Sequence, residues 1–98
     1  MTDAPVPEQW ILRLYIAGMT PTAMTALANI KEICATHLAG RYTLEVVDLL
    51  ERPTLADGDQ IFAVPTLVRQ LPPPLRKIIG DLSDTEKVVV GLDIQPLP

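Results

Sequence analysis

The chain has 98 residues, of which 48% are hydrophobic, and its 8 Lys and Arg against 12 Asp and Glu give a net charge of −4. This length predicts a single domain over residues 1–98, with a flexible N-terminus over 1–9 and a short C-terminal tail over 95–98. The acidic balance argues against a nucleic-acid-binding protein, which usually carries a basic stripe. The chain has no apolar run near the roughly 20 residues that cross a bilayer, no signal-peptide pattern in MTDAPVPEQW and one cysteine. We therefore expect a cytoplasmic protein without membrane contact.

The first predicted strand is the nearly continuous apolar run WILRLYIAG, residues 10–18, which is typical of a central parallel strand buried on both faces. Arg13 interrupts this run. Either its aliphatic stem follows the sheet while its head reaches solvent or a carboxylate, or its head contacts a partner protein. We favour the first interpretation and retain Arg13 as a candidate partner contact.

A helix is predicted from Pro21 to a stop signal at Gly40, because Thr20 can cap it and proline suits its first position. Apolar residues recur at helical spacing and predict the buried stripe, which consists of Met24, Leu27, Ile30 or Lys31, Cys34 and Leu38. Cys34 is therefore expected to be a small buried side chain rather than a reactive thiol. His37 suits the C-terminus of the helix and has no metal-binding neighbours.

A second strand is predicted over residues 42–50, and strand, helix and strand in this order form a right-handed unit with parallel strands. A short helix follows in ERPTLADGDQIFA, with Thr54 as its cap. The next apolar segment, AVPTLV over residues 63–68, predicts a strand that contains Pro65. Proline cannot donate to a strand ladder, so Pro65 is expected at a sheet edge, at a bulge or at a cis bend.

The rest of the chain gives conflicting local signals. The triple proline at 72–74 predicts a stiff turn or the entry to a helix. LRKIIGDL then fits either a strand that ends at Gly80 or a helix. Ser83 and Glu86 form a capping box that predicts a helix, whereas the valine run that follows favours a strand. Two interpretations stay open: a short helix packed on the sheet, or two competing folds for the second half of the chain.

The segments ILRLYIAGMTP, VVDLLERPTLADGDQIFAVPTL and LPPPLRKIIGDLSDTEKVVVGLD resemble the KaiB family of circadian-clock proteins, without gaps from about residue 10 to residue 94. The resemblance implies an α/β chain with two folds. One is a monomeric thioredoxin-like βαβαββα fold without redox activity, and the other is a KaiB-specific βαββααβ fold that forms a tetramer. The first half is common to both folds, which matches the division between a clear first half and an ambiguous second half.

The resemblance also implies a non-enzymatic protein without cofactors. In this family the thioredoxin-like form binds the N-terminal ATPase ring of KaiC, a hexameric ATPase and autokinase, and opposes KaiC phosphorylation. It sequesters KaiA where KaiA exists and displaces the kinase SasA. The implied partners of this chain are therefore a KaiC-like ATPase, KaiA or a SasA-like kinase, and further copies of itself as a dimer or tetramer.

Gly91 and Asp93 match the family's GLD motif, whose positions bias the choice between the two folds. Glycine disfavours a helix interior and tolerates unusual dihedral angles, so its presence can tip a near balance. The strand-end proline and those of the switch region match as well: Pro65, Pro72, Pro73 and Pro74. In a thiol-redox relative the cysteines would lie within AGMTPT, which has none here. The resemblance therefore implies that Pro65 shapes a docking surface.

Several positions that are commonly basic in the cyanobacterial clock proteins have lost or reversed their charge here: Thr25, Glu45, Glu51 and Gln60. Since charge complementarity sets partner choice, we expect a divergent member with a divergent KaiC-like partner. The alternatives are a thiol-dependent redox protein with Cys34 as nucleophile, or a structural oligomer without an ATPase partner. No catalytic set is recognised, and two carboxylate pairs are interpreted as turn and capping groups: Asp57 with Asp59, and Asp81 with Asp84.

Overall fold

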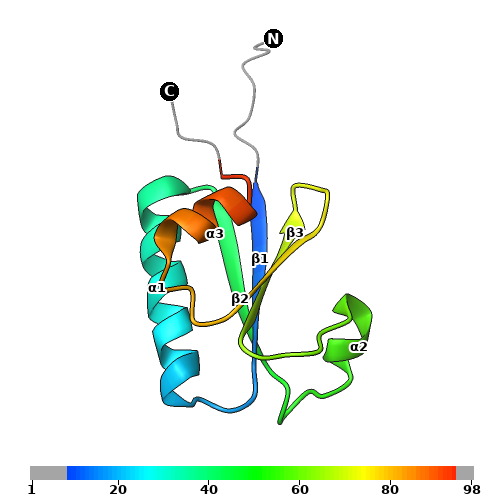
Figure 1. The fold of residues 1–98 in the computed structure, drawn as a ribbon. Helices are drawn as coiled ribbons and strands as arrows, with labels where there is room; N and C mark the ends of the chain where they lie inside the picture. The colour runs from blue at the N-terminus through cyan, green and yellow to red at the C-terminus, as the bar shows by residue number, and fades with distance from the viewer. Residues whose placement is uncertain (1–8, 95–98) are drawn as a thin grey trace.

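The structure, a computed structural model, describes residues 9–94. Its elements follow in the order β1 (Trp10–Ile16), α1 (Pro21–His37), β2 (Tyr42–Asp48), α2 (Leu55–Asp59), β3 (Thr66–Leu71), β4 (Arg76–Ile79) and α3 (Thr85–Gly91) (Figure 1). This βαβαββα order confirms the thioredoxin-like fold expected for the chain. Residues 1–8 and 95–98 lie outside the described residues. They include the predicted C-terminal tail and, except for residue 9, the N-terminal segment expected to be flexible.

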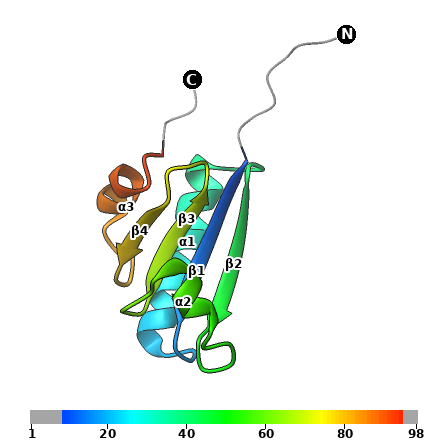
Figure 2. The same cartoon turned by 90° about the vertical axis from the view of Figure 1, so that its right-hand side faces the viewer.

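The four strands form one mixed sheet in the order β2-β1-β3-β4, and Figure 2 shows them side by side. β1 and β2 are parallel, as predicted, whereas β3 is antiparallel to both β1 and β4. The register places Ile16 opposite Asp48, and Thr66 opposite both Tyr15 and Ile79. One end of the sheet therefore combines the last residues of β1, β2 and β4 with the first residue of β3.

Helices α1 and α3 cover one face of the sheet, and the short α2 lies on the other (Figure 1). The main core lies between the sheet and these two helices and includes the fully buried Leu12 and Leu14 of β1. On the opposite face, Tyr15, Val47 and Val68 form a smaller cluster with partly buried side chains from α2 and its flanking loops. The apolar sequence of β1 follows from its burial on both faces.

Helix α1 begins as predicted but packs on a different face. The amide of Ala23 donates to Thr20 Oγ1 at 3.1 Å, and Pro21 is the first helical residue. The predicted stripe is wrong at Met24, whose side chain is 57% exposed. The buried residues of the helix are Ala23, Ala26, Ile30, Ile33 and Cys34. The alanines face the sheet because small side chains let the helix pack closely. The prediction selected the larger apolar side chains for the buried face and therefore did not include these alanines.

In the second half, residues 76–79 adopt the strand interpretation and residues 85–91 adopt the helical one. The predicted strand over residues 63–68 begins later than expected, because β3 starts at Thr66. The physical reason is Pro65, which has no amide hydrogen to donate to a strand ladder.

The two predicted helix caps have different outcomes. Thr54 occupies the N-cap position of α2, as predicted, but its side chain makes no capping hydrogen bond. At α3 the cap is Asp84 rather than Ser83, because the carboxylate of Asp84 accepts a hydrogen bond from the amide of Lys87 at 3.1 Å. Serine and aspartate are both favourable cap residues, so the sequence is compatible with a helix that begins after either one. The negative charge of a carboxylate at the helix N-terminus is also favoured by the helix dipole, which explains the choice of Asp84.

Candidate docking surface and switch junction

The strand-end proline, Pro65, lies at the sheet end where β1 and β2 finish. Its peptide bond with Val64 is cis, as the sequence analysis allowed. A pocket beside it is lined by Ile16, Ala17, Thr20, Thr22, Ala23, Val64 and Pro65. None of these side chains carries a thiol. The pocket therefore cannot exchange disulfides in the way that a pair of cysteines does.

The single cysteine, Cys34, lies late in α1, and its side chain is fully buried. Burial raises the pKa of the Cys34 thiol to about 12. Because the thiolate is the nucleophilic form, this thiol is unreactive near neutral pH. The prediction of a small buried side chain is confirmed, and the geometry argues against the redox alternative.

Exposed apolar side chains gather at the same end of the sheet as the Pro65 pocket. They come from the loops after β1 and β2, the loop before β3 and the last residue of β4: Met19, Leu50, Phe62, Val64 and Ile79, which we call the apolar rim. Phe62 is 92% exposed and Ile79 is 64% exposed. Exposed apolar surface of this kind marks interaction sites, so the apolar rim is the candidate docking surface.

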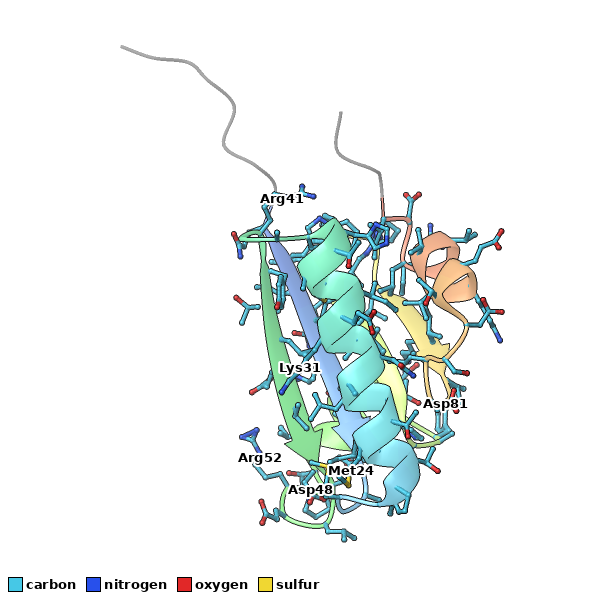
Figure 3. The ribbon with its side chains drawn as sticks, turned by 90° about the vertical axis from the view of Figure 1, so that its left-hand side faces the viewer. Met24, Lys31, Arg41, Asp48, Arg52 and Asp81 are labelled. Carbon is cyan, nitrogen blue, oxygen red and sulfur yellow. The ribbon has the colours of Figure 1, made fainter. Side chains whose placement is uncertain are left out.

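Asp48, at the end of β2, fixes the loops that present the apolar rim. Its carboxylate accepts hydrogen bonds from the amide of Gly18 at 3.0 Å and the amide of Leu50 at 2.9 Å. Gly18 has φ +75°, and a Cβ there would lie 3.1 Å from Leu50 Cδ1. Figure 3 shows Asp48 and Met24 at one end of the molecule and Arg41 at the other. The sequence analysis missed this role of Asp48, although a carboxylate at a strand end before two leucines was an available signal.

Charged and polar side chains flank the apolar rim, and the four positions expected to alter partner choice are all exposed: Thr25, Glu45, Glu51 and Gln60. Glu45 forms ion pairs with Arg13 at 2.6 Å and Arg52 at 3.6 Å. Arg13 also donates to the Tyr15 hydroxyl at 3.1 Å, and this bond, with a smaller effect from Glu45, raises the pKa of Arg13. The favoured interpretation, a carboxylate contact along the sheet, is confirmed. Contact of Arg13 with a partner protein stays a prediction.

Four of the sequence-predicted residues meet at the opposite end of the sheet. A second pocket there is lined by Trp10, Arg41, Arg69, Pro72, Pro73, Pro74 and Asp93. We call this group the switch junction. It combines the start of β1, the turn between β3 and β4, and the residues that follow α3. The triple proline forms the stiff turn that was one of its two predicted forms, with cis bonds before Pro72 and Pro74.

The GLD motif overlaps the switch junction, because its Asp93 lines the pocket there. Gly91 is the last residue of α3, and its backbone does not adopt the unusual dihedral angles that the sequence analysis suggested for it. A Cβ at Gly91 would instead lie 2.9 Å from Ile78 Cδ1 in β4, so close packing explains the glycine. The left-handed conformation occurs at Asp93, which has φ +56°. That Gly91 and Asp93 bias the choice of fold stays a prediction.

Arg69 is one of three residues of the switch junction, with Trp10 and Arg41, that the sequence analysis did not name as candidates. It lies in β3 and is only 3% exposed. Its guanidinium donates to the carbonyl of Leu92 at 2.5 Å and to the carbonyl of Pro74 at 2.8 Å. It also lies 5.2 Å from the centre of the Trp10 ring. Strand alternation in TLVRQL places position 69 on the same face as the buried Leu67, which was the available signal.

The remaining polar candidates have local roles. The carboxylate of Asp81 accepts a hydrogen bond from the amide of Ser83 at 3.0 Å, and hydrogen bonds from the Ser83 side chain and backbone lower the pKa of Asp81. Asp81 and Asp84 are therefore turn and capping groups, as predicted. Asp57 is exposed in α2, while the side chain of Asp59 is outside the described part. Within the described residues, no three His, Cys, Asp or Glu could hold a metal ion, and no helix is long and apolar enough to span a bilayer.

The sequence over residues 13–94 matches the family model of the KaiB domain. The chain belongs to the KaiB family. The circadian clock oscillator protein KaiB of Trichodesmium erythraeum is 52% identical over 91 residues, which cover 93% of this chain and 88% of that protein. The protein of the same name from Prochlorococcus marinus is 55% identical over 87 residues, which cover 89% of this chain and 81% of that protein. The resemblance inferred from the three sequence segments is thereby confirmed.

Solved structures confirm the thioredoxin-like fold. The N-terminal domain of SasA from Synechococcus elongatus has a TM-score of 0.74 at 20% identity, with 100% of this chain and 96% of that domain covered. Mitochondrial thioredoxin 3 of Saccharomyces cerevisiae has a TM-score of 0.69 at 18% identity, with 89% of this chain and 80% of that protein covered. At these identities the likeness establishes the fold alone. Function has to be argued from the site.

Proposed function

We propose that this chain is a non-enzymatic regulatory protein of a circadian-clock type, which binds a KaiC-like hexameric ATPase and autokinase and modulates its phosphorylation. Membership of the KaiB family and relatives named circadian clock oscillator proteins support this proposal. One observation carries it furthest. The pocket beside cis Pro65 has no thiol, while exposed apolar side chains gather at the same end of the sheet. In this proposal the end of the sheet that carries Pro65 binds a partner protein instead of exchanging disulfides.

The apolar rim supplies the binding energy in this proposal. Interfaces draw most of their affinity from a few large side chains that become enclosed on binding. Phe62 is the most exposed large apolar side chain of the described residues, so it is the expected centre of the contact. The exposed carboxylates Glu45, Glu51 and Asp57 govern partner choice and association rate more than affinity. They favour a KaiC-like partner whose facing surface is basic.

Fold switching is the second part of the proposal. The other arrangement is the tetrameric βαββααβ fold implied by the family, and only the thioredoxin-like form binds the ATPase. The fraction of chains in that form then scales the apparent affinity. The conflicting signals within residues 72–94 and the exposed apolar Ile79 support this view, since this side chain is available for burial between copies.

The same proposal names the other partners. The shared fold with the SasA N-terminal domain supports competition between this chain and a SasA-like kinase for the ATPase ring. A KaiA-like protein is a further partner where one is present. Such a protein acts in the cytoplasm and has no catalytic group of its own.

Binding to the KaiC-like ATPase of the same organism tests the function, with affinity measured by calorimetry and phosphorylation of the ATPase followed in parallel. We expect Phe62→Ser to weaken binding at least about tenfold, because truncation of a central interface side chain typically costs about 2 kcal/mol or more, and about 1.4 kcal/mol is tenfold. Val90→Ser is the matched control, since Val90 is 72% exposed and lies on α3, away from the apolar rim. Its affinity should equal that of the unchanged chain.

The outcomes separate the function from the location of the docking surface. Failure of the unchanged chain to bind any KaiC-like ATPase of its organism would overturn the proposed function. Normal binding by Phe62→Ser, or weaker binding by Val90→Ser alone, would leave the function standing and exclude the apolar rim as its docking surface.

A further inference from the structure

We propose that Arg69 holds the triple-proline turn and the end of α3 together, and thereby sets the preference of residues 66–94 for the thioredoxin-like arrangement. The inference rests on the fold switch of the proposed function. It names the residue that supplies much of the free-energy difference in favour of the thioredoxin-like arrangement. The GLD motif directs attention to Gly91 and Asp93, whereas the contacts point to a side chain of β3.

One buried side chain links three parts of the fold. Arg69 is 3% exposed, and it is the one buried charged side chain among the residues that the structure describes. Its guanidinium donates to the carbonyl of Pro74 in the turn and to that of Leu92 after α3. Its third contact, over the ring of Trp10 at 5.2 Å, is with β1, in the half of the chain that both folds share.

The chemistry of the guanidinium makes these contacts interdependent. A buried charge is tolerated only where hydrogen bonds and aromatic faces replace its water. The planar guanidinium presents its donors in a fixed fork, so both carbonyls have to lie in defined places at once. The Leu92 carbonyl closes the C-terminal end of a helix, where a cation is favoured. Removal of either acceptor would leave the buried charge poorly compensated, which is strongly destabilising.

The proposed fold switch would break these contacts. In the βαββααβ arrangement that the family resemblance implies, the residues now in β4 would form a helix and those near the end of α3 a strand, so the carbonyls of Pro74 and Leu92 would not both stay beside β3. Gly91 contributes by the same geometry. Its lack of a Cβ lets α3 approach Ile78 of β4, and this approach places the next residue, Leu92, within reach of Arg69.

The test compares Arg69→Met with Arg76→Met by native-state hydrogen exchange and two-dimensional NMR. Arg76 pairs with Arg69 in the β3–β4 register but is exposed, so it is a matched control for loss of an arginine. The amides of Leu92 and Ile94 donate to the carbonyls of Val88 and Val89 and report the end of α3. In Arg69→Met we expect them to exchange at least about tenfold faster relative to the amides of β1, because two hydrogen bonds from a charged group are lost. Shifts of Leu71 and Leu75, which flank the triple proline, should change with them.

Arg69→Lys provides the second variant, since it retains the charge but cannot reach both carbonyls with one ammonium group. It should show a smaller local effect, and it decides the question if Arg69→Met does not fold. Uniform acceleration across β1 and α3, no acceleration, or the same effect in Arg76→Met would overturn the role of Arg69. Faster exchange confined to the end of α3 would support the contacts of Arg69 with the turn and α3. A second set of NMR signals, with helical shifts over residues 75–80 and the slow tumbling of an oligomer, would support the fold switch as well. Local loosening without those signals would support the link that Arg69 makes between the turn and α3, but it would contradict the effect of Arg69 on the choice of fold and the fold switch itself.

Discussion

The segment from β1 to β2 and the segment from α2 to α3 are held in place by different kinds of contact. In the first segment fully buried apolar side chains dominate, including Leu12, Leu14 and Ile30. The second is richer in exposed ones: of the nine large apolar side chains that are exposed in the described chain, six lie beyond residue 60, namely Phe62, Val64, Leu71, Leu75, Ile79 and Val90. Its attachments include directional hydrogen bonds, such as those of Arg69 and the 2.9 Å bond from Asn29 to the carbonyl of Asp81.

If the proposed fold switch occurs, this difference explains why the second half of the chain rearranges while the first half stays constant. Burial of apolar surface is large, and it is lost whenever a close-packed segment moves. A segment held by a few directional contacts can exchange them for others, and two packings then differ by only a few kcal/mol. Four experiments can break or sharpen this comparison.

The largest expected effect concerns the thiol enclosed in the first half. Burial raises the pKa of Cys34 from 9.0 to about 12, so below pH 9 the folded protein holds about a thousandfold less thiolate than the unfolded chain. Alkylation of the native protein near pH 8 should be slower by at least that factor. Its rate should rise as pH increases up to about 12, whereas the rate for unfolded protein levels off near 9. Fast labelling of native protein at pH 8 would contradict the closed core and revive a redox function.

Leu14→Ala should cost about 3 kcal/mol of stability, because Leu14 is fully buried in β1 and its truncation leaves a cavity in the core. Since β1 belongs to both arrangements, the ratio between them should not change. Denaturant unfolding measures the cost, and NMR signals of residues 75–80 measure the ratio. Met24→Ala is the control, because the exposed Met24 should cost under ~0.5 kcal/mol. A changed ratio in Leu14→Ala would show that the two halves are not independent.

Asp84→Ala should destabilise α3 by about 1 kcal/mol, since the carboxylate of Asp84 accepts the capping bond from Lys87. The neighbouring Ser83→Ala should change stability by less than ~0.5 kcal/mol, because Ser83 precedes the cap. Both values come from denaturant unfolding, with amide exchange of α3 as the local measure. A larger loss of stability in Ser83→Ala than in Asp84→Ala would show that Ser83 is the cap, in a capping box with Glu86.

The smallest effect tests the close approach of α3 to β4. Gly91→Ala should gain up to about 1 kcal/mol of helix propensity, which the contact with Ile78 Cδ1 at 2.9 Å largely offsets. In an Ile78→Val background the Cδ1 methyl is absent and the Cγ1 carbon, at 3.3 Å, remains, so part of the gain should appear, at about 0.5 kcal/mol. A double-mutant cycle measures this coupling. A coupling near zero would mean that packing against Ile78 does not limit residue 91.

Much of the first half was predictable because its signals are local and agree with one another. The apolar run of β1, the Thr20 cap with Pro21, and the burial of Cys34 were all confirmed. The stripe of α1 was wrong at Met24, since apolar spacing does not say how closely a helix approaches its sheet. Of the candidate sites, cis Pro65 and the turn at 72–74 could be placed from sequence, because proline restricts its own backbone.

By itself the sequence determined the family, the parallel βαβ unit and the absence of a cysteine pair, since these follow from residue identity and from short-range pattern. Only the tertiary structure decided between strand and helix at residues 76–79, because β4 exists through its pairing with β3 and not through its own propensity. The same holds for the buried contacts of Arg69, the packing of Gly91 on Ile78 and the gathering of the apolar rim at one end of the sheet. Each joins residues far apart in the chain, and local pattern carries no information about which distant segments meet.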